Sequence, residues 1–455
     1  MQEGLTRENK MGVMPVGKLL MSMSLPIMIS MLIQALYNIV DSMFAARISE
    51  DALTAVSLAF PIQNLMIAVA TGTGVGMNSL LSKALGAKDF DRANRAATNG
   101  LFVLVLSCVP FMLFGGLLTD WFMRTQTDIE SIILHGDSYL RVVCLVSVGA
   151  FGAIAVERLL QATGKTVYSM ITQAVGAVVN IALDPVLIFG LCGLPAMGVT
   201  GAAVATVISQ CVSFVLGIVF NVCCNREISL SYRGFRPDGH IIGRIYAVGV
   251  PSILMASIGS VMTFFMNRIL IAFSSTATAV LGVYFKLQSF IFMPIFGLNN
   301  GLVPIVSYNY GAKKKKRMMR SIKLAILTAL CIMAAGFLAF ELIPDQLMGL
   351  YNASEHMLSI GEPALRIIGI HFLIAGYCIV AGSVFQALGN ALPSLITSLA
   401  RQLVVLLPVA WLLAQTGNVN NVWWAFPIAE VMSAAMTTLF FVREYRAKIK
   451  PLPEE

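Results

Sequence analysis

The stretch from Leu25 to Asp41 decides the fold: it reads LPIMISMLIQALYNIVD, an apolar run that ends in an acid. A carboxylate inside a membrane-spanning helix costs several kcal/mol unless it faces protein or water. Gln34, Tyr37 and Asn38 precede Asp41 at helical spacing, so these side chains share one face of the helix. We therefore predict a transmembrane helix whose polar face lines a cavity, with Asp41 as a functional residue.

The composition indicates the class of protein. Of the 455 residues, 57% are hydrophobic and 12% are charged, whereas soluble domains carry about 25% charged residues. The net charge of +8 does not indicate nucleic-acid binding, because the basic residues lie in short loops between apolar runs. The four histidines and eight cysteines show no metal-ligand spacing, so no cofactor is expected. We predict an all-α, polytopic membrane protein.

Twelve apolar runs are long enough to cross a membrane, since a helix needs roughly 20 residues to span about 30 Å of hydrocarbon. They lie at 16–47, 53–83, 93–121, 132–160, 167–191, 197–223, 241–273, 277–308, 318–343, 356–387, 392–415 and 422–443. Lys and Arg are concentrated in alternate connections. By the positive-inside rule, both termini and the basic loop from Lys313 to Arg317 are cytoplasmic, in a multi-pass protein of the cell membrane.

An internal repeat organises the chain. Pro26 matches Pro251, 225 residues later, and the same offset joins further pairs without a gap. Among them are Phe60 and Phe285, Gln63 and Gln288, Gly72 and Gly297, Gly76 and Gly301, and Arg92 and Arg317. We predict two six-helix lobes, 1–224 and 241–455, joined by a cytoplasmic linker at 225–240. Because six is an even number, the lobes form a parallel repeat, as in secondary transporters.

Specific motifs recur along nearly the whole chain. Besides the helix from Pro26 to Asp41, they are Gly72-x-Gly74-x-Gly76, Gly86-Ala87-Lys88, Gln161-Ala162-Thr163-Gly164, Asn180-x-x-x-Asp184-Pro185 and Gly201-Ala202-Ala203-x-Ala205-Thr206. Together they resemble the bacterial and archaeal branch of the multidrug and toxic compound extrusion (MATE) family. The resemblance implies a drug/cation antiporter with a proton or sodium site in the N-terminal lobe.

By position, the resemblance implies that this coupling site comprises Asp41, Tyr139, Asn180, Asp184 and a threonine of the sixth helix. Thr200 and Thr206 are both near, and the Ala-Thr match favours Thr206.

The residues themselves support an ion site. Asn180 lies one helical turn before Asp184, so both can point into the same cavity as Asp41. Pro185 cannot donate to the carbonyl four residues earlier, which leaves an extra oxygen ligand beside the acid. Carboxylates, amides, phenols and hydroxyls are hard ligands that accept an alkali cation, or that a proton can replace. If sodium is the coupling ion, we predict Asp41, Asn180 and Asp184 as its ligands; Tyr37 is predicted in the same coupling site.

The acids occur in one half only. At the offset of 225, Asp41 corresponds to Met266 and Asp184 to Val409, so coupling chemistry is predicted in the N-terminal lobe alone. Methionine and phenylalanine crowd the seventh and eighth helices and indicate a promiscuous, hydrophobic pocket. The predicted substrate cavity comprises Gln34, Asn38, Gln63, Met266, Gln288 and Met293.

Other intramembrane charges are given structural roles. Arg401 and Glu430 both lie near mid-membrane when residues are counted from the helix ends, so we predict an ion pair between them, with Lys286 as the competing partner. Glu157 and Arg158 lie near the cytoplasmic end of their helix and are predicted to be interfacial.

The predicted function is secondary active multidrug efflux by a monomer. Lipophilic or cationic drugs or toxic metabolites would leave in exchange for protons or sodium ions, by alternating access across the lipid bilayer. A cation between Asp41 and Asp184 would compete with substrate for the same carboxylates. Within the superfamily, the alternative is a lipid-linked saccharide flippase. An ion channel or an intramembrane enzyme is disfavoured, because the sequence has no repeated filter motif and no paired nucleophile and base.

Overall fold

The computed structural model is helical throughout. It describes residues 8–191, 193–230, 235–351 and 353–453, without the side chains of Asn38, Ile39, Ser42, Ala45, Ala46 and Glu50. In this part of the chain, ten helices are long and apolar enough to cross a membrane, and two bent helix pairs bring the number to twelve if each pair is one span. The predicted all-α fold with twelve spans is confirmed.

The helices of the N-terminal lobe are α1 (Lys10–Val13), α2 (Val16–Ile48), α3 (Glu50–Gly86), α4 (Phe90–Leu106), α5 (Val109–Leu117), α6 (Thr119–Gln126), α7 (Glu130–Leu145), α8 (Val148–Ala162), α9 (Thr166–Phe189) and α10 (Gly198–Cys223). Those of the C-terminal lobe are α11 (Gly239–Ile271), α12 (Ser275–Gly311), α13 (Lys315–Leu342), α14 (Pro344–Gly349), α15 (Glu355–Gly369), α16 (Phe372–Ala387), α17 (Leu392–Leu399), the π-helix η1 (Ala400–Leu406), α18 (Leu407–Ala414), α19 (Val419–Val422), α20 (Ala425–Glu444) and the π-helix η2 (Tyr445–Ile449). The bent spans are α7 with α8, at 47°, and α15 with α16, at 50°.

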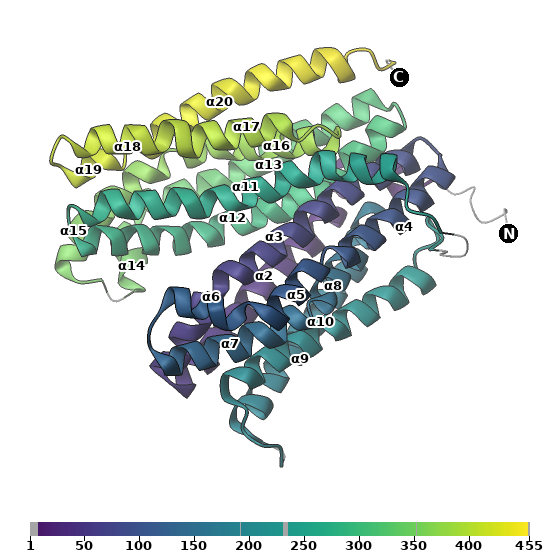
Figure 1. Ribbon diagram of the computed structural model, residues 1–455. Coiled ribbons are helices and arrows are strands. Elements are labelled where there is room, and N and C mark those ends of the chain that lie inside the picture. The colour runs from purple at the N-terminus through teal and green to yellow at the C-terminus, as the bar shows by residue number, and fades with distance from the viewer. Residues whose placement is uncertain (1–7, 192, 231–234, 352, 454–455) are drawn as a thin grey trace.

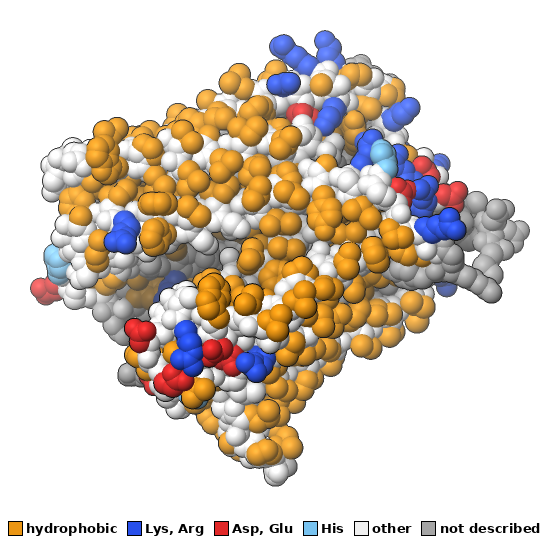
Figure 2. All heavy atoms as spheres, in the orientation of Figure 1, with side chains coloured by type: hydrophobic (Ala, Val, Ile, Leu, Met, Phe, Trp, Pro, Cys, Tyr) orange, Lys and Arg blue, Asp and Glu red, His pale blue; other side chains and the backbone are white. Residues whose placement is uncertain are grey.

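The two lobes are visible in Figure 1 as the groups α2 to α10 and α11 to α20. They approach each other at the end that carries both termini and separate toward the end that carries α6, α14 and α15. Lys and Arg side chains gather at the end with the termini, which we call the basic end (Figure 2). On the face shown, hydrophobic side chains cover the surface between the two ends, and this face is hollowed between the lobes at the far end. Such a belt is expected of a protein embedded in lipid.

The repeat is preserved in local geometry. α3 and α12 begin and end at positions that differ by 225. Ser49 and Ser274 precede these helices, and each hydroxyl accepts a hydrogen bond from the backbone N–H three residues on, at 3.0 and 3.1 Å. Such caps satisfy one of the unpaired N–H groups at a helix start. Lys88 and Lys313 have φ of 58° and 59°, the left-handed region that few side chains adopt. The two halves thus repeat at the level of single backbone angles.

Glycines allow the lobes to pack closely. α3 packs on α11, and α12 packs on α2. A methyl group on Gly72 of α3 would lie 2.6 Å from a side-chain atom of α11, and one on Gly297 of α12 would lie 2.7 Å from a Cα atom of α2. Gly86 and Gly311, at the basic end, face backbone carbonyls of the opposite lobe even more closely. Small side chains let helix backbones approach in this way, so the repeat builds a symmetric contact between the lobes.

Candidate functional site

The predicted coupling residues come together in the N-terminal lobe. Asp41 of α2 and Asp184 of α9 lie close enough for their charges to interact. Tyr37 of α2 and Tyr139 of α7 lie within reach of the charges of both acids. Nε2 of Gln63 on α3 donates a hydrogen bond to the Tyr139 hydroxyl at 2.9 Å. Four helices therefore contribute to one polar cluster.

Asn180 extends this cluster to α10. Its Nδ2 donates to Oγ1 of Thr206 at 3.5 Å, and the Thr206 hydroxyl donates in turn to the carbonyl of Ala202 at 3.0 Å. The structure thus places Thr206 beside the predicted coupling residues.

Four oxygen atoms in this cluster have no hydrogen-bond donor among the described residues. They are Oδ1 of Asp41, both carboxylate oxygens of Asp184, and Oδ1 of Asn180. Asp184 has no exposed surface, and a buried carboxylate without a partner is costly unless it is protonated or binds a cation. Oxygen donors of this kind suit hard cations. The set can chemically accommodate a proton or an alkali cation.

A cavity of about 560 Å³, which we call the N-lobe cavity, adjoins the cluster. Gln34, Tyr37 and Asn180 line it, together with residues of α3, α8 and α10 and, from the other lobe, of α11 and α12. Small-molecule sites are typically about 300 to 1,000 Å³ in volume. Neither Asp41 nor Asp184 is among the described residues of this lining. Tyr37 and Asn180 therefore belong to both the acid cluster and the cavity wall.

Glu157 and Arg158 of α8 also line the N-lobe cavity, so their predicted interfacial position is wrong. Arg158 is only 7% exposed. Its Nη1 donates to Oε1 of Gln161 at 3.1 Å and, across the lobe contact, to Oδ1 of Asn300 on α12 at 3.0 Å. The sequence repeat contains a signal for a functional role of both residues: their counterparts 225 residues later are uncharged, so the charges are not required by the shared scaffold.

The remaining predicted cavity residues are dispersed. Gln63 is bonded to Tyr139, and Gln288 lines a separate C-lobe cavity of about 260 Å³. Met266 has no exposed surface, so its predicted place in a cavity wall is corrected to the packed core. Met293 is half-buried on α12 and is absent from both linings. The Asn38 side chain lies outside the described part of the structure.

Arg401 lines the C-lobe cavity and forms the ion pair predicted with Glu430. Nη1 of Arg401 and Oε2 of Glu430 are 3.0 Å apart, and Glu430 is 2% exposed, so this prediction is confirmed. Lys286, the competing partner, instead places its Nζ over the ring of Tyr351, 5.5 Å from the centroid. Both carboxylate and guanidinium thus have a partner here, unlike Asp184, whose carboxylate oxygens have no donor among the described residues.

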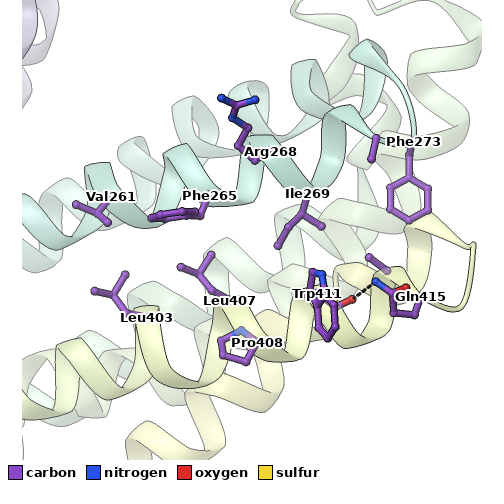
Figure 3. A pocket seen from close by; sticks show the side chains of 12 residues that line it. Val261, Phe265, Arg268, Ile269, Phe273, Leu403, Leu407, Pro408, Trp411 and Gln415 are labelled. Atoms are coloured by element: carbon purple, nitrogen blue, oxygen red, sulfur yellow. Dashed lines mark hydrogen bonds between the residues drawn. The ribbon is translucent and has the colours of Figure 1, made fainter.

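A groove of about 840 Å³ runs along the outer face of the C-terminal lobe, between α11 and α18. Figure 3 shows Phe265 and Ile269 of α11 opposite Leu407 and Trp411, with Arg268 pointing away. Phe265 is 49% exposed and Trp411 57% exposed. The groove is therefore part of the hydrophobic belt, and its lining contains no acid, so it is not the candidate site.

Comparison with known proteins follows the same two-lobed division. The family model MatE matches residues 26–186 and 251–412, once in each lobe. Multidrug export protein MepA of Staphylococcus haemolyticus (strain JCSC1435) is 26% identical over 435 residues, 95% of each chain. MepA of Staphylococcus aureus (strain MRSA252) is 26% identical over 440 residues, 94% of this chain and 95% of that one.

Solved structures share the fold over its full length. A multidrug resistance MATE family transporter of the MOP superfamily, in an outward-facing conformation, superposes with a TM-score of 0.90 at 25% identity, covering 98% of this chain and 99% of that one. A MOP superfamily transporter from Pyrococcus furiosus Vc1 (DSM3638) gives 0.90 at 24% identity over 99% of each chain. Because the family model covers most of both lobes, the chain belongs to the MatE family, the multidrug and toxic compound extrusion transporters that its motifs resemble.

Proposed function

We propose that this transporter exports lipophilic, cationic compounds in exchange for protons or sodium ions. One observation carries the proposal: buried carboxylate oxygens, one of Asp41 and both of Asp184, lack donors among the described residues and adjoin a cavity of drug size between two lobes. The name of the MepA relatives, multidrug export protein, supports small organic compounds as the cargo. As a member of a transporter family, the chain is not an enzyme.

Two helices link the ion to the substrate in this mechanism. α2 carries Asp41 together with the cavity residues Gln34 and Tyr37, and α9 carries Asp184 together with Asn180. A cation or a proton at the acids removes their mutual repulsion, so α2 and α9 can move together and reshape the cavity wall. A gradient drives export only if the ion binds one conformation better than the other, and this change in the wall supplies that difference.

The two lobes provide the alternating access. They pack through glycines toward the basic end and are separated at the far end (Figures 1 and 2). We place the basic end and both termini in the cytoplasm, following the positive-inside rule, in a protein of the cell membrane that faces outward in this conformation. Reporter fusions after Thr127 and Asn418 should lie outside, and those after Asp89 and Asp238 inside. A reporter after Asp238 that faces outward would contradict the proposed orientation.

The acid cluster and the N-lobe cavity are each built within one chain, which supports a monomer as the transporting unit. A lipid-linked saccharide flippase would need a more basic cavity. Arg158 is the one basic side chain among the described residues of the lining, and it lies next to Glu157. The lining therefore favours efflux of cations over the flippase.

Transport by purified protein in liposomes tests the proposal. The liposomes are loaded with ethidium, a fluorescent lipophilic cation, and proton and sodium gradients are imposed separately. We expect one gradient to accelerate ethidium efflux over protein-free liposomes, and its reversal to stop the acceleration. Equal efflux with and without either gradient would contradict antiport.

A further inference from the structure

Glu157 is an intramembrane acid that the coupling mechanism does not use. It lies on α8 and lines the N-lobe cavity. Its Oε1 accepts a hydrogen bond from Nε2 of Gln161 at 2.6 Å, and the neutral side chains of Ser169 and Gln173 also face its carboxylate. None of the ion pairs formed by the described residues includes Glu157. These donors are neutral, and Arg158, whose charge reaches this carboxylate, forms no ion pair with it among the described residues.

The neighbouring arginine is directed toward the other lobe. Arg158 donates to Asn300 of α12, and a methyl group on Gly74 would lie 2.8 Å from its Cγ. The missing side chain at Gly74 therefore makes room for the arginine stem along α3. Because Arg158 is held in this direction, the Glu157 carboxylate can meet a ligand in the cavity.

The rest of the lining suits a lipophilic body. Ile27, Met31, Ile154 and Phe296 form apolar parts of the wall, and Glu157 is the one acid among the described residues of the lining. A carboxylate in such a site attracts a cation far more strongly than it would in water. We propose that Glu157 binds the positive charge of the exported compound, while Asp41 and Asp184 bind only the coupling ion.

This inference rests on the proposed function and replaces direct competition for shared carboxylates. The ion and the substrate then occupy separate sites that share Tyr37 and Asn180 as a common wall. The C-terminal lobe has Gly382 at the position equivalent to Glu157. Recognition of the cation, like ion coupling, thus belongs to the N-terminal lobe.

Binding of two compounds that differ in charge tests this assignment. The probes are tetraphenylphosphonium, a permanent lipophilic cation, and uncharged triphenylphosphine oxide, each measured by equilibrium dialysis against the purified full-length protein. E157Q should weaken tetraphenylphosphonium binding roughly 10- to 100-fold, the effect of losing a charge-assisted contact, and leave triphenylphosphine oxide unchanged. E157D, which keeps the charge, should restore most of the preference for the cation. E341Q, which removes an acid of α13 outside the cavity, is the matched control.

The outcomes separate this inference from the proposed function. D41N should keep tetraphenylphosphonium binding but lose ion-driven export, whereas E157Q should keep the ion-dependent change in hydrogen exchange of α2 and α9. The assignment is overturned if wild-type protein does not prefer the cation, if E157Q weakens both compounds equally, or if D41N abolishes the preference. Absence of ion-driven export by wild-type protein with the preference intact would reject the antiport mechanism and leave this site standing.

Discussion

The two lobes share a backbone frame but not their charges. Helix ends, caps and glycine contacts repeat at the offset of 225. The intramembrane charges do not repeat: Asp41, Glu157, Arg158 and Asp184 correspond to Met266, Gly382, Ser383 and Val409, while Lys286, Arg401 and Glu430 correspond to Pro61, Gly176 and Ala205. The frame is kept because each lobe must pack against the other. Side chains inside a lobe face no such constraint, and there the chemistry has diverged.

The equivalent residues Gly176 and Arg401 show what this divergence does to the interior. Gly176 lines the N-lobe cavity of about 560 Å³. In the C-terminal lobe, Arg401 extends from the same position to Glu430, and the cavity there is about 260 Å³. A small residue leaves the space open, whereas a paired charge fills it. We interpret the C-terminal pair as structural, since breaking a buried pair is costly even where its net contribution is small.

The largest expected effect lies in the acids. D41N and D184N keep side-chain size but remove the charge that binds the coupling ion, so each should lower ion-driven export to the level of protein-free liposomes. The matched changes M266L and V409I in the C-terminal lobe should leave export intact. Gradient-driven efflux is measured at equal reconstituted amounts. Full coupling in either Asn variant would remove that acid from the mechanism, and loss in both controls would contradict the asymmetry of the lobes.

The next largest effect is a loss of stability when the ion pair between Arg401 and Glu430 is broken. E430A should lower the free energy of unfolding by about 2 to 3 kcal/mol, because it leaves Arg401 without its partner. The effect is smaller than for a fully buried pair, since the Arg401 side chain is 28% exposed. Thermal unfolding in detergent measures it. The double variant R401M/E430M should recover most of the loss and retain export; failure to export despite recovered stability would give the pair a transport role.

The lobe contact should respond symmetrically. G86A and G311A each place a methyl group against a carbonyl of the opposite lobe, and each should cost about 1 to 2 kcal/mol through overpacking. G282A is the control, because its methyl group would meet nothing within 4 Å. Thermal unfolding compares the three variants. A loss in only one of the two matched glycines would show that the contact is not symmetric.

The smallest effect lies in the linker. Asp238 caps α11 by accepting from the backbone N–H groups of His240 and Ile241, at 2.9 and 3.3 Å, and also pairs with Arg95. These contacts, the Ile241 N–H first, hold the pKa of Asp238 below its ordinary value. The stabilisation is therefore present above the ordinary pKa of an aspartate, about 4, and is lost as the pH falls through the lowered value. D238N should melt slightly earlier at neutral pH and match wild type in acid; an equal difference at both pH values would exclude the carboxylate as the cause.

The frame could be predicted from the sequence because it acts through many residues at once. Apolar runs of sufficient length show each span, and the shared offset of Pro26 and Pro251 or of Gly72 and Gly297 exposes the two lobes. The acids of the N-terminal lobe could also be singled out, since a carboxylate such as Asp184 is too costly in lipid to be incidental. The apolar runs can be recognised because the free energy of burial sums over a whole helix. The acids can be recognised because the cost of one carboxylate in lipid is large by itself.

The positions of Glu157 and Met266 could not be derived in this way. Glu157 lies near the end of α8, as its place in the sequence indicates, but α8 lines a cavity there, and Asn300 of the other lobe binds its neighbour Arg158. Met266 shares a scaffold position with Asp41, yet equivalent positions need not face equivalent spaces, and here the side chain is enclosed by the core. Which face of a helix meets a cavity is decided by tertiary packing, which apolar periodicity does not report.

The glycine contact at the basic end also determines how far the opposite end of the lobes moves when they rotate. α3 has 37 residues, so it is about 55 Å long at roughly 1.5 Å per residue. If Gly86 and Gly311 act as the fulcrum, a rotation of about 10° sweeps the far end of such a helix through roughly 10 Å. A long stroke at the mouth thus needs only a small displacement at the pivot. A larger side chain at this contact changes the angle between the lobes. Because the helices are long, a small change of angle there produces a large change in the width of the opening at the far end.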